Sequence, residues 1–234
     1  MIHQSVSING IDMLSTYRMA LANRHCVQPP VPKTIYQDVP GADGSLDLST
    51  AIAGRIIYER RVITLNFGCG YPMDKWPEVF SEILRNFHGR EGKLIFDDDP
   101  MYYYAGRMTV SEYSRARTLG TFTISVNADP YKYELTASDE DWLWDSFSFE
   151  KGVIRDYKEL EVSGSLSINV PGTQRWVIPE ITVSAAMTVS YDGKDYELKQ
   201  GTNRIYDIVI KEGENVLMFT GTGTVTISYR GGIL

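Results

Sequence analysis

Three consecutive aspartates, Asp97, Asp98 and Asp99, are the first candidates for metal or acid chemistry in this 234-residue sequence. A calcium loop needs oxygen ligands at alternating positions, a central glycine and a later bidentate glutamate, and none of these accompanies the aspartates. Successive side chains of an extended segment also point to opposite faces, so the three carboxylates do not converge on one ion. Pro100 follows directly, and both residue types favour turns. We interpret the group as a turn, with a metal site as the weaker alternative, and expect no cofactor.

Nucleophilic and acid–base motifs are equally sparse. The three histidines, His3, His25 and His88, lie far apart in the sequence, and no Gly-x-Ser-x-Gly, His-Glu-x-x-His or phosphate-binding loop occurs. Two cysteines, Cys26 and Cys69, show no local pairing pattern and are expected to be free thiols. A thiol nucleophile is the enzymatic alternative. We predict that the chain is not an enzyme.

Acidic and aromatic residues near the middle of the chain suggest a second kind of chemistry. Asp139, Glu140 and Asp141 are carboxylates of the type used in glycoside hydrolysis, but in a polar segment they are more simply solvated. Trp142 and Trp176 are possible glycan contacts, because an exposed indole ring stacks well on a sugar. The alternative is that these tryptophans pack in a core or at an interface.

Composition restricts the class of protein further. The formal net charge is −7, hydrophobic residues make up 43% and charged residues 23%, which is ordinary for a globular protein. An acidic chain is a poor match for nucleic-acid binding, which depends on a basic patch. No apolar run approaches the ~20 residues that a membrane span requires, and the N-terminus is too polar for a signal peptide. We expect synthesis in the cytoplasm and no membrane partner.

A helix is predicted over residues 74–88, and we interpret the rest of the chain as organised around it. Asp74 is a suitable N-cap, Pro77 fits the first turn, and Gly89 can end the helix in a left-handed conformation. The apolar residues between them recur three and four apart and share one face: Trp76, Val79, Phe80, Ile83, Leu84 and Phe87. His88 then lies at the C-terminus, where an imidazole favours the helix dipole. That apolar face requires a sheet to cover it.

Most of the remaining chain has strand and turn patterns. Asn9-Gly10 predicts a small hairpin within residues 5–11, and Gly41-Ala42-Asp43-Gly44 predicts a loop. Residues 56–67 form a strand candidate in which Ile63, Leu65 and Phe67 share one face. Residues 108–113 and 118–126 read as a second hairpin. The first domain is therefore predicted to be a β domain packed on a helix.

We place a domain boundary near Tyr133, giving domains of residues 1–133 and 134–234. Regularly spaced short runs separated by glycine turns indicate that the second domain is a β-sandwich. Asp192-Gly193 is the strongest hairpin signal in the chain. The expected strands of this domain are residues 159–170, 180–191, 194–198, 205–210, 214–219 and 224–229.

The order and spacing of several motifs resemble the distal tail protein family of long-tailed bacteriophages (siphophages) and prophages. The motifs are the tryptophan-bearing helix ending in His88-Gly89, the acidic turn followed by tyrosines and Gly106-Arg107, the loop Gly41–Leu48, Tyr58-Glu59-Arg60-Arg61 before a strand, Ala128-Asp129-Pro130-Tyr131, and the closing run Gly221–Gly232. Each motif is weak by itself, and the resemblance covers nearly the whole chain.

This resemblance implies a structural virion protein at the distal end of a phage tail. It implies a hexameric ring, possibly stacked, built by the first domain, with a galectin-like or carbohydrate-binding-module-like second domain. Expected partners are the tail tube protein, the tail-associated lysin or tip protein, the tape measure, and receptor-binding or baseplate proteins, with DNA passing through an acidic lumen. From exposure and charge we expect Asp43, Asp47, Arg115 and Arg117 at the oligomer interface. The alternative is a carbohydrate-binding β-sandwich that contacts host surface glycans.

Overall fold

The computed structural model describes residues 5–22, 26–72, 74–115, 120–140 and 156–234. These residues are mostly β, in antiparallel sheets, with one helix of twelve residues and one of five. The predicted class, a mainly β chain with one principal helix, is confirmed. The chain divides into two compact units. Unit 1 is Met1–Asp99, Tyr103–Lys132 and Leu234, and unit 2 is Pro100–Tyr102 and Tyr133–Ile233.

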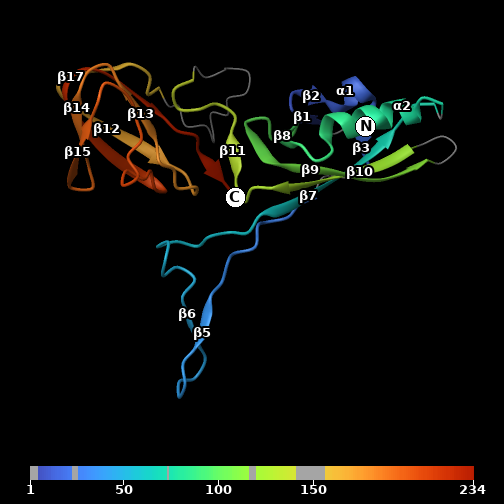
Figure 1. Ribbon diagram of the computed structural model, residues 1–234, viewed down its shortest axis with the longest axis horizontal. Coiled ribbons are helices and arrows are strands. Elements are labelled where there is room, and N and C mark those ends of the chain that lie inside the picture. The colour runs from blue at the N-terminus through green and yellow to red at the C-terminus, as the bar shows by residue number, and fades with distance from the viewer. Residues whose placement is uncertain (1–4, 23–25, 73, 116–119, 141–155) are drawn as a thin grey trace. The chain divides into compact units, whose positions relative to one another are not determined.

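Unit 1 is built on one antiparallel sheet of strand order β2-β1-β8-β9-β10-β7-β3, with β4 also paired to β7 (Figure 1). A separate two-stranded pair, β5–β6, lies outside this sheet. The elements are β1 (Val6–Ile8), β2 (Ile11–Asp12), α1 (Met13–Tyr17), β3 (Met19–Leu21), β4 (Cys26–Val27), β5 (Tyr36–Asp38), β6 (Ser45–Asp47), β7 (Arg61–Cys69), α2 (Trp76–Phe87), β8 (Glu91–Phe96), β9 (Tyr102–Arg115) and β10 (Gly120–Ala128).

The long strands β7 and β10 form the centre of this sheet. Their register runs from Arg61 opposite Ala128 to Cys69 opposite Gly120. Ile63, Leu65 and Phe67 are buried while the residues between them face outward, so the predicted alternation is confirmed. The predicted start at residue 56 was wrong, because residues 56–60 form the base of an excursion of the chain and the ladder begins at Arg61.

Helix α2 covers one face of the sheet but starts later than predicted. Its N-cap is Lys75, without a side-chain capping bond, so the prediction that Asp74 caps a helix of residues 74–88 was wrong. Pro77 does occupy the first turn, and its missing N–H explains why the helix tolerates an uncapped start. Gly89, at φ +73°, follows His88 and ends the helix as predicted.

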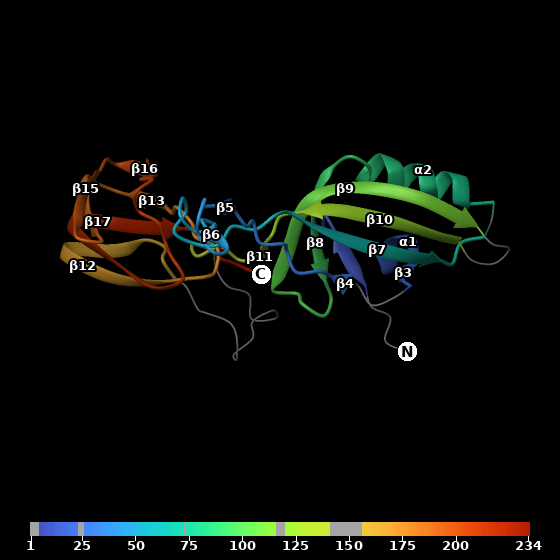
Figure 2. The same ribbon diagram turned by 90° about the horizontal axis from the view of Figure 1, so that it is seen from below.

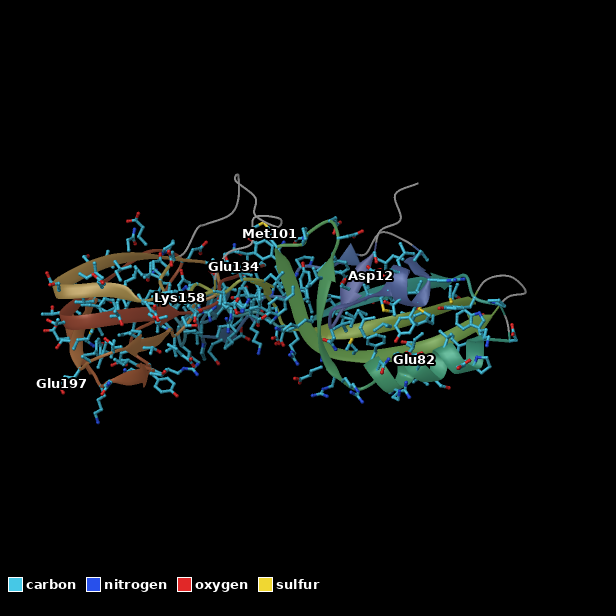
Figure 3. The ribbon with its side chains drawn as sticks, turned by 90° about the horizontal axis from the view of Figure 1, so that it is seen from above. Asp12, Glu82, Met101, Glu134, Lys158 and Glu197 are labelled. Atoms are coloured by element: carbon cyan, nitrogen blue, oxygen red, sulfur yellow. The ribbon has the colours of Figure 1, made fainter. Side chains whose placement is uncertain are left out.

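The apolar face of α2 completes the core of unit 1. Trp76, Ile83 and Phe87 are buried in one cluster with the inward residues of β7, β9 and β10, and each such side chain contributes roughly 1.5–3 kcal/mol. Both helices lie on the same side of these strands (Figure 1). Tyr17 of α1 donates its hydroxyl proton to Glu82 of α2 at 3.1 Å, and the two helices are marked by Asp12 and Glu82 in Figure 3.

Unit 2 contains a six-stranded antiparallel sheet of order β15-β14-β17-β13-β16, with β12 along the other side of β17. Its core is a separate cluster of buried residues that includes Val189, Leu217 and Phe219. The strands are β11 (Lys132–Glu134), which pairs with β18, β12 (Leu160–Gly172), β13 (Glu180–Val183), β14 (Met187–Tyr191), β15 (Lys194–Leu198), β16 (Gly201–Asn203), β17 (Gly213–Ser228) and β18 (Gly232–Ile233).

Four predicted strands of unit 2 need correction. The predicted strands 214–219 and 224–229 are parts of one long strand, β17, which ends at Ser228 and pairs first with β14 and then with β13. Residues 180–191 form two strands, β13 and β14. Residues 205–210 are not a strand: Ile208 and Ile210 are buried from an irregular segment, and only an isolated bridge joins Ile210 to Val177. Apolar residues two apart therefore predict burial, but they do not by themselves predict a hydrogen-bonded strand.

Two loops of unit 2 repeat one design that the sequence analysis missed. Residues 199–203 (KQGTN) and 211–215 (KEGEN) share a Lys-x-Gly-x-Asn pattern. In both, the asparagine oxygen accepts from the lysine N–H and the asparagine amide donates to the carbonyls of the lysine and the glycine. Gly201 and Gly213 have φ of +99° and +93°, which explains why glycine stands at the centre.

Candidate assembly interface

The acidic turn after β8 has a structural role. Asp97 accepts the backbone N–H of Ser5 at 2.8 Å, and Asp99 forms a 2.5 Å ion pair with Lys132. Within the described residues, no group of three or more His, Cys, Asp or Glu side chains is arranged to hold a metal ion. The interpretation of the aspartates as a turn between β8 and β9 is therefore confirmed.

The other candidates for catalysis that the structure describes are also held in structural contacts, while His3 and His25 lie outside the described residues. His88 accepts the backbone N–H of Val110 through Nδ1 at 3.1 Å. Asp139 accepts the hydroxyl of Ser228 at 2.9 Å, and Glu140 accepts the N–H of Ala137 at 2.8 Å, while Asp141 lies outside the described residues. Burial raises the pKa of the free Cys69 thiol, which leaves it largely protonated and unreactive.

The glycan hypothesis gains little from the described part of unit 2. Trp176 is half-buried, and the ammonium group of Lys211 lies 5.9 Å from its ring centroid, so a cation already occupies one side of the ring. Trp142 lies outside the described residues. The structure thus places one of the two candidate tryptophans and shows it in contact with its own unit.

The most exposed apolar surface belongs to residues 31–59, which we call the arm. Eight large apolar side chains are exposed on it, including Val31 at 64% and Ile52 at 91%; the others are Ile35, Tyr36, Val39, Leu46, Ile56 and Ile57. None of the eight belongs to the core cluster of either unit. Exposure of apolar residues on this scale marks an interaction surface.

The two ends of the arm are joined to each other and to the start of unit 1's long strands. The N–H of Lys33 donates to the carbonyl of Ile57 at 2.7 Å, and the N–H of Glu59 donates to the carbonyl of Val31 at 2.8 Å. Outside the arm, Tyr131 accepts a hydrogen bond from Arg55 at 3.0 Å, and its ring meets that of Tyr58 edge-on at 6.1 Å. The chain therefore leaves and re-enters unit 1 at one defined place, next to the start of β7 (Figure 1).

Arg61 secures this junction from within the core. Its guanidinium is only 5% exposed, donates to the carbonyl of Pro130, and lies 5.4 Å from the ring centroid of Tyr104. Burial lowers the pKa of Arg61 and raises that of the Tyr104 hydroxyl, so the cation sits against a neutral phenol. Arg60, next to it, pairs with Asp129 at the end of β10.

The outer part of the arm is an amphipathic hairpin. Residues directly opposite in an antiparallel pair share a face, and the register pairs Tyr36 with Asp47 and Gln37 with Leu46. The side chains therefore separate into two sets. One face carries Ile35, Gln37, Val39, Leu46 and Leu48, and the other carries Tyr36, Asp38, Ser45 and Asp47. Ile35, Val39 and Leu46 of the first face are exposed in the described chain.

The second face of the hairpin is stabilised by short hydroxyl–carboxylate contacts. Ser45 donates to Asp38 at 2.5 Å. Ser49 donates both its hydroxyl proton, at 2.5 Å, and its backbone N–H, at 2.9 Å, to Asp47. The two bonds from Ser49 favour the ionised form and lower the pKa of the Asp47 carboxyl. This face thus carries two carboxylates, each held by a serine hydroxyl.

Three of the four predicted interface residues lie in the described part of the chain, and these three do not form one cluster. Asp43 lies at the exposed tip of the hairpin and Asp47 on β6. Arg115 ends β9, its side chain is not described, and Arg117 lies outside the described residues. The arm joins the sheet at Arg61, whereas Arg115 lies opposite Gly120, which pairs with Cys69 at the other end of β7, roughly 26 Å away at ~3.3 Å per residue.

The face of the sheet away from the helices is uncharged on β7 and β10. Figure 2 looks onto β9, β10 and β7 from this side, with α2 behind them. The outward side chains of β7 and β10 are Val62, Thr64, Asn66, Thr121, Thr123, Ser125 and Asn127. Thr123 donates its hydroxyl proton to Asn66 at 2.8 Å. On β9 the same face carries Arg107, opposite Asn127, which pairs with Glu91 of β8.

Comparison with known proteins identifies the fold. No protein-family model and no curated protein matches the sequence significantly. The structure is instead similar to the crystal structure of the Dit (gp 19.1) protein of SPP1, described as a paradigm of the hub adsorption apparatus in phages that infect Gram-positive hosts. The match covers 99% of both chains with a TM-score of 0.62 at 14% identity. The chain therefore has the Dit fold.

Proposed function

We propose that this chain is a structural virion protein, the distal tail hub of a long-tailed phage or prophage. The observation that carries the proposal is the likeness to the SPP1 hub over 99% of both chains, with neither unit left unmatched. The motifs that suggested the family in the sequence are spread through both units, and this agrees with a likeness of the whole chain.

In this proposal six copies form a ring at the distal end of the tail. The ring joins the tail tube to the tip or baseplate and the host-adsorption proteins, contacts the tape measure and the tail-associated lysin, and lets DNA pass. A closed ring needs two different surfaces on each subunit that bind head to tail. The arm supplies one such surface, because eight exposed apolar side chains have no place in either core.

The proposed role is structural rather than catalytic. The candidate acids, the histidine on α2 and Cys69 are engaged in turns, caps and the core, as described above. No helix in the described ranges is long and apolar enough to span a membrane. The location that fits is the virion tail.

Light scattering over a range of concentrations tests the proposal. The expected result is a species of about six times the 26.4 kDa chain mass, and electron microscopy of that species should show closed rings with a central opening. A persistent monomer that binds to a glycan array would instead support the carbohydrate-binding alternative and contradict a ring of this chain alone.

A further inference from the structure

The sheet of unit 2 presents one continuous face to solvent. Residues that lie directly opposite each other on antiparallel strands share a face, and the register places Met218 of β17 between Ser167 of β12 and Ser190 of β14. Leu217 and Phe219, on either side of Met218 in the sequence, are buried in the core. The other registers extend the same outward face over β13, β15 and β16. We call this surface the outer face of unit 2.

The centre of the outer face combines hydroxyl groups with two exposed apolar side chains. Val216 is 55% exposed and Met218 is 46% exposed, and alternation along β17 directs both to the same side. The outward residues next to them on the three neighbouring strands are Ser165, Ser167, Asn169, Thr188, Ser190 and Thr220. None of the outward positions on these strands holds an aromatic residue.

Carboxylates lie at the margin of the outer face, at strand ends or on the edge strand β15, where Figure 3 labels Glu197. They are Glu161 on β12, Glu180 on β13, Asp195 and Glu197 on β15, and Glu214 on β17. No lysine or arginine occupies an outward position on the described strands β12 to β17. Two cations follow these strands in loops, Lys199 after β15 and Arg204 after β16, and Arg204 lies 3.9 Å from Glu180.

This composition selects one kind of occupant. A glycan finds no aromatic ring on which to stack, and a nucleic acid meets carboxylates where its phosphates need cations. A protein surface with basic residues around an apolar centre is complementary in both respects. Interfaces have an apolar centre and a polar rim, and opposite charges face each other across them.

We propose that the outer face of unit 2 binds a different tail protein, through a surface on which lysines or arginines surround an apolar side chain. The inference rests on the proposed function, because that function places the chain in a tail particle beside other proteins. Val216 and Met218 form the centre of this contact. Asp195 and Glu197 pair with the partner's cations at its margin.

Photo-crosslinking in purified tails identifies the occupant. p-Benzoylphenylalanine replaces Met218 in the full chain, and in a control chain it replaces Tyr206, which is 73% exposed on a loop of the same unit. Position 218 should link to a different protein, next to lysines or arginines, with a yield at least about fivefold above that of the control. A link to another copy of this chain or to an acidic segment, or equal yields at the two positions, overturns the proposal.

Charge substitutions test the margin of the contact. Asp195→Lys with Glu197→Lys should lower the yield from position 218 at least about fivefold, because cations then face cations. Lysine is well tolerated on an edge strand such as β15. The neutral pair Asp195→Asn with Glu197→Gln should lower the yield about threefold.

The matched control is Asp207→Lys with Glu212→Lys, which reverses two exposed carboxylates in the segment between β16 and β17. It should lower the yield by less than about twofold. Urea unfolding midpoints show that each variant is folded. Equal losses in the control and in the β15 variants contradict a contact at the outer face.

The outcomes separate this inference from the proposed function. Tails that contain the chain but give no adduct from position 218 overturn the contact, while the hub proposal stands. Purified tails from which the chain is absent contradict the hub proposal itself.

Discussion

At the scale of single residues, Gly120 shows why packing distant in sequence escapes a sequence-based prediction. A Cβ added to Gly120 would lie 1.6 Å from the Trp76 ring, so the helix can approach β10 only because this position has no side chain. The periodicity of α2 correctly predicts that Trp76 is buried. Nothing in the sequence says that residue 120 lies beneath it, because 44 residues separate the two positions.

Gly120→Ala should therefore destabilise unit 1 by about 2–4 kcal/mol, since Trp76 must move out of its packed position. Gly68→Ala is the matched control, because Gly68 lies on the neighbouring strand opposite Thr121 and an added Cβ there meets nothing within 4 Å. Urea unfolding followed by tryptophan fluorescence measures both. A Gly120→Ala variant as stable as Gly68→Ala would contradict the close approach.

Asp12 predicts a pH dependence of the same unit. It caps α1, and the hydroxyl of Ser5, at 2.5 Å, and the N–H of Ser15, at 2.6 Å, donate to its carboxylate. The Ser5 bond is the largest cause of a lowered pKa in the folded protein. A lowered folded pKa adds stability above the unfolded pKa of about 3.9, and this stability is lost as pH falls through the folded value.

Asp12→Asn keeps a capping oxygen but removes the titration. The variant should be less stable than the wild type by up to about 1 kcal/mol at pH 6, and the difference should shrink below pH 4. Urea midpoints at pH 6, 5 and 3.5 provide the measurement. A difference that stays constant across this range would show that the carboxylate charge has no part in the cap.

At the scale of elements, local signals predicted what local physics controls. The hairpins at Asn9-Gly10 and Asp192-Gly193 and the end of α2 at Gly89 depend on neighbouring residues, and the structure has each of them. The limits of the other strands depend on pairing between segments that are distant in the sequence. The division of residues 180–191 and the continuity of β17 follow from which strands lie alongside, and no local pattern specifies that.

The candidate site was predicted only in part for a related reason. The loop from Gly41 to Asp47, with Asp43 and Asp47, was expected at an interface, but the apolar face of the arm was not. Ile35 and Val39 flank β5 and Leu46 lies on β6, and they share one face only through the β5–β6 register. Their exposure is a property of the folded chain, and no local pattern in the sequence specifies it.

The two Lys-x-Gly-x-Asn loops allow a comparison within one sheet. Asn215 is 4% exposed, and its side chain makes five hydrogen bonds, which include the hydroxyl of Tyr191 and the carbonyl of Val170. Asn203 has the same local bonds but is partly exposed. Water can replace lost partners only at the exposed site.

Asn215→Ala should consequently cost about 2–4 kcal/mol in unfolding free energy, and Asn203→Ala about 1 kcal/mol. Chemical denaturation of the two variants, compared with the wild type, measures the difference. If both substitutions lower the unfolding free energy equally, burial of the asparagine does not determine how much its hydrogen bonds stabilise the loop.

At the scale of the whole molecule, the charge pattern predicts how the protein behaves toward DNA. The net charge is −7, and the outward side chains of β7 and β10 carry no cation, so the chain offers little to neutralise phosphates. Fluorescence anisotropy with labelled duplex DNA should show no binding at about 150 mM salt. Tight, steeply salt-dependent binding would contradict both this prediction and passage of DNA without retention.

The arm also has a consequence for the route of assembly. In an open chain of subunits joined by arms, each added copy makes one contact, but the copy that closes a ring makes two, and the second forms at the high effective concentration of groups already tethered together. Partial rings should therefore be scarce beside free subunits and complete rings. A contact through one small hairpin, too weak to keep two copies together, would then still make the closed ring the only stable assembly.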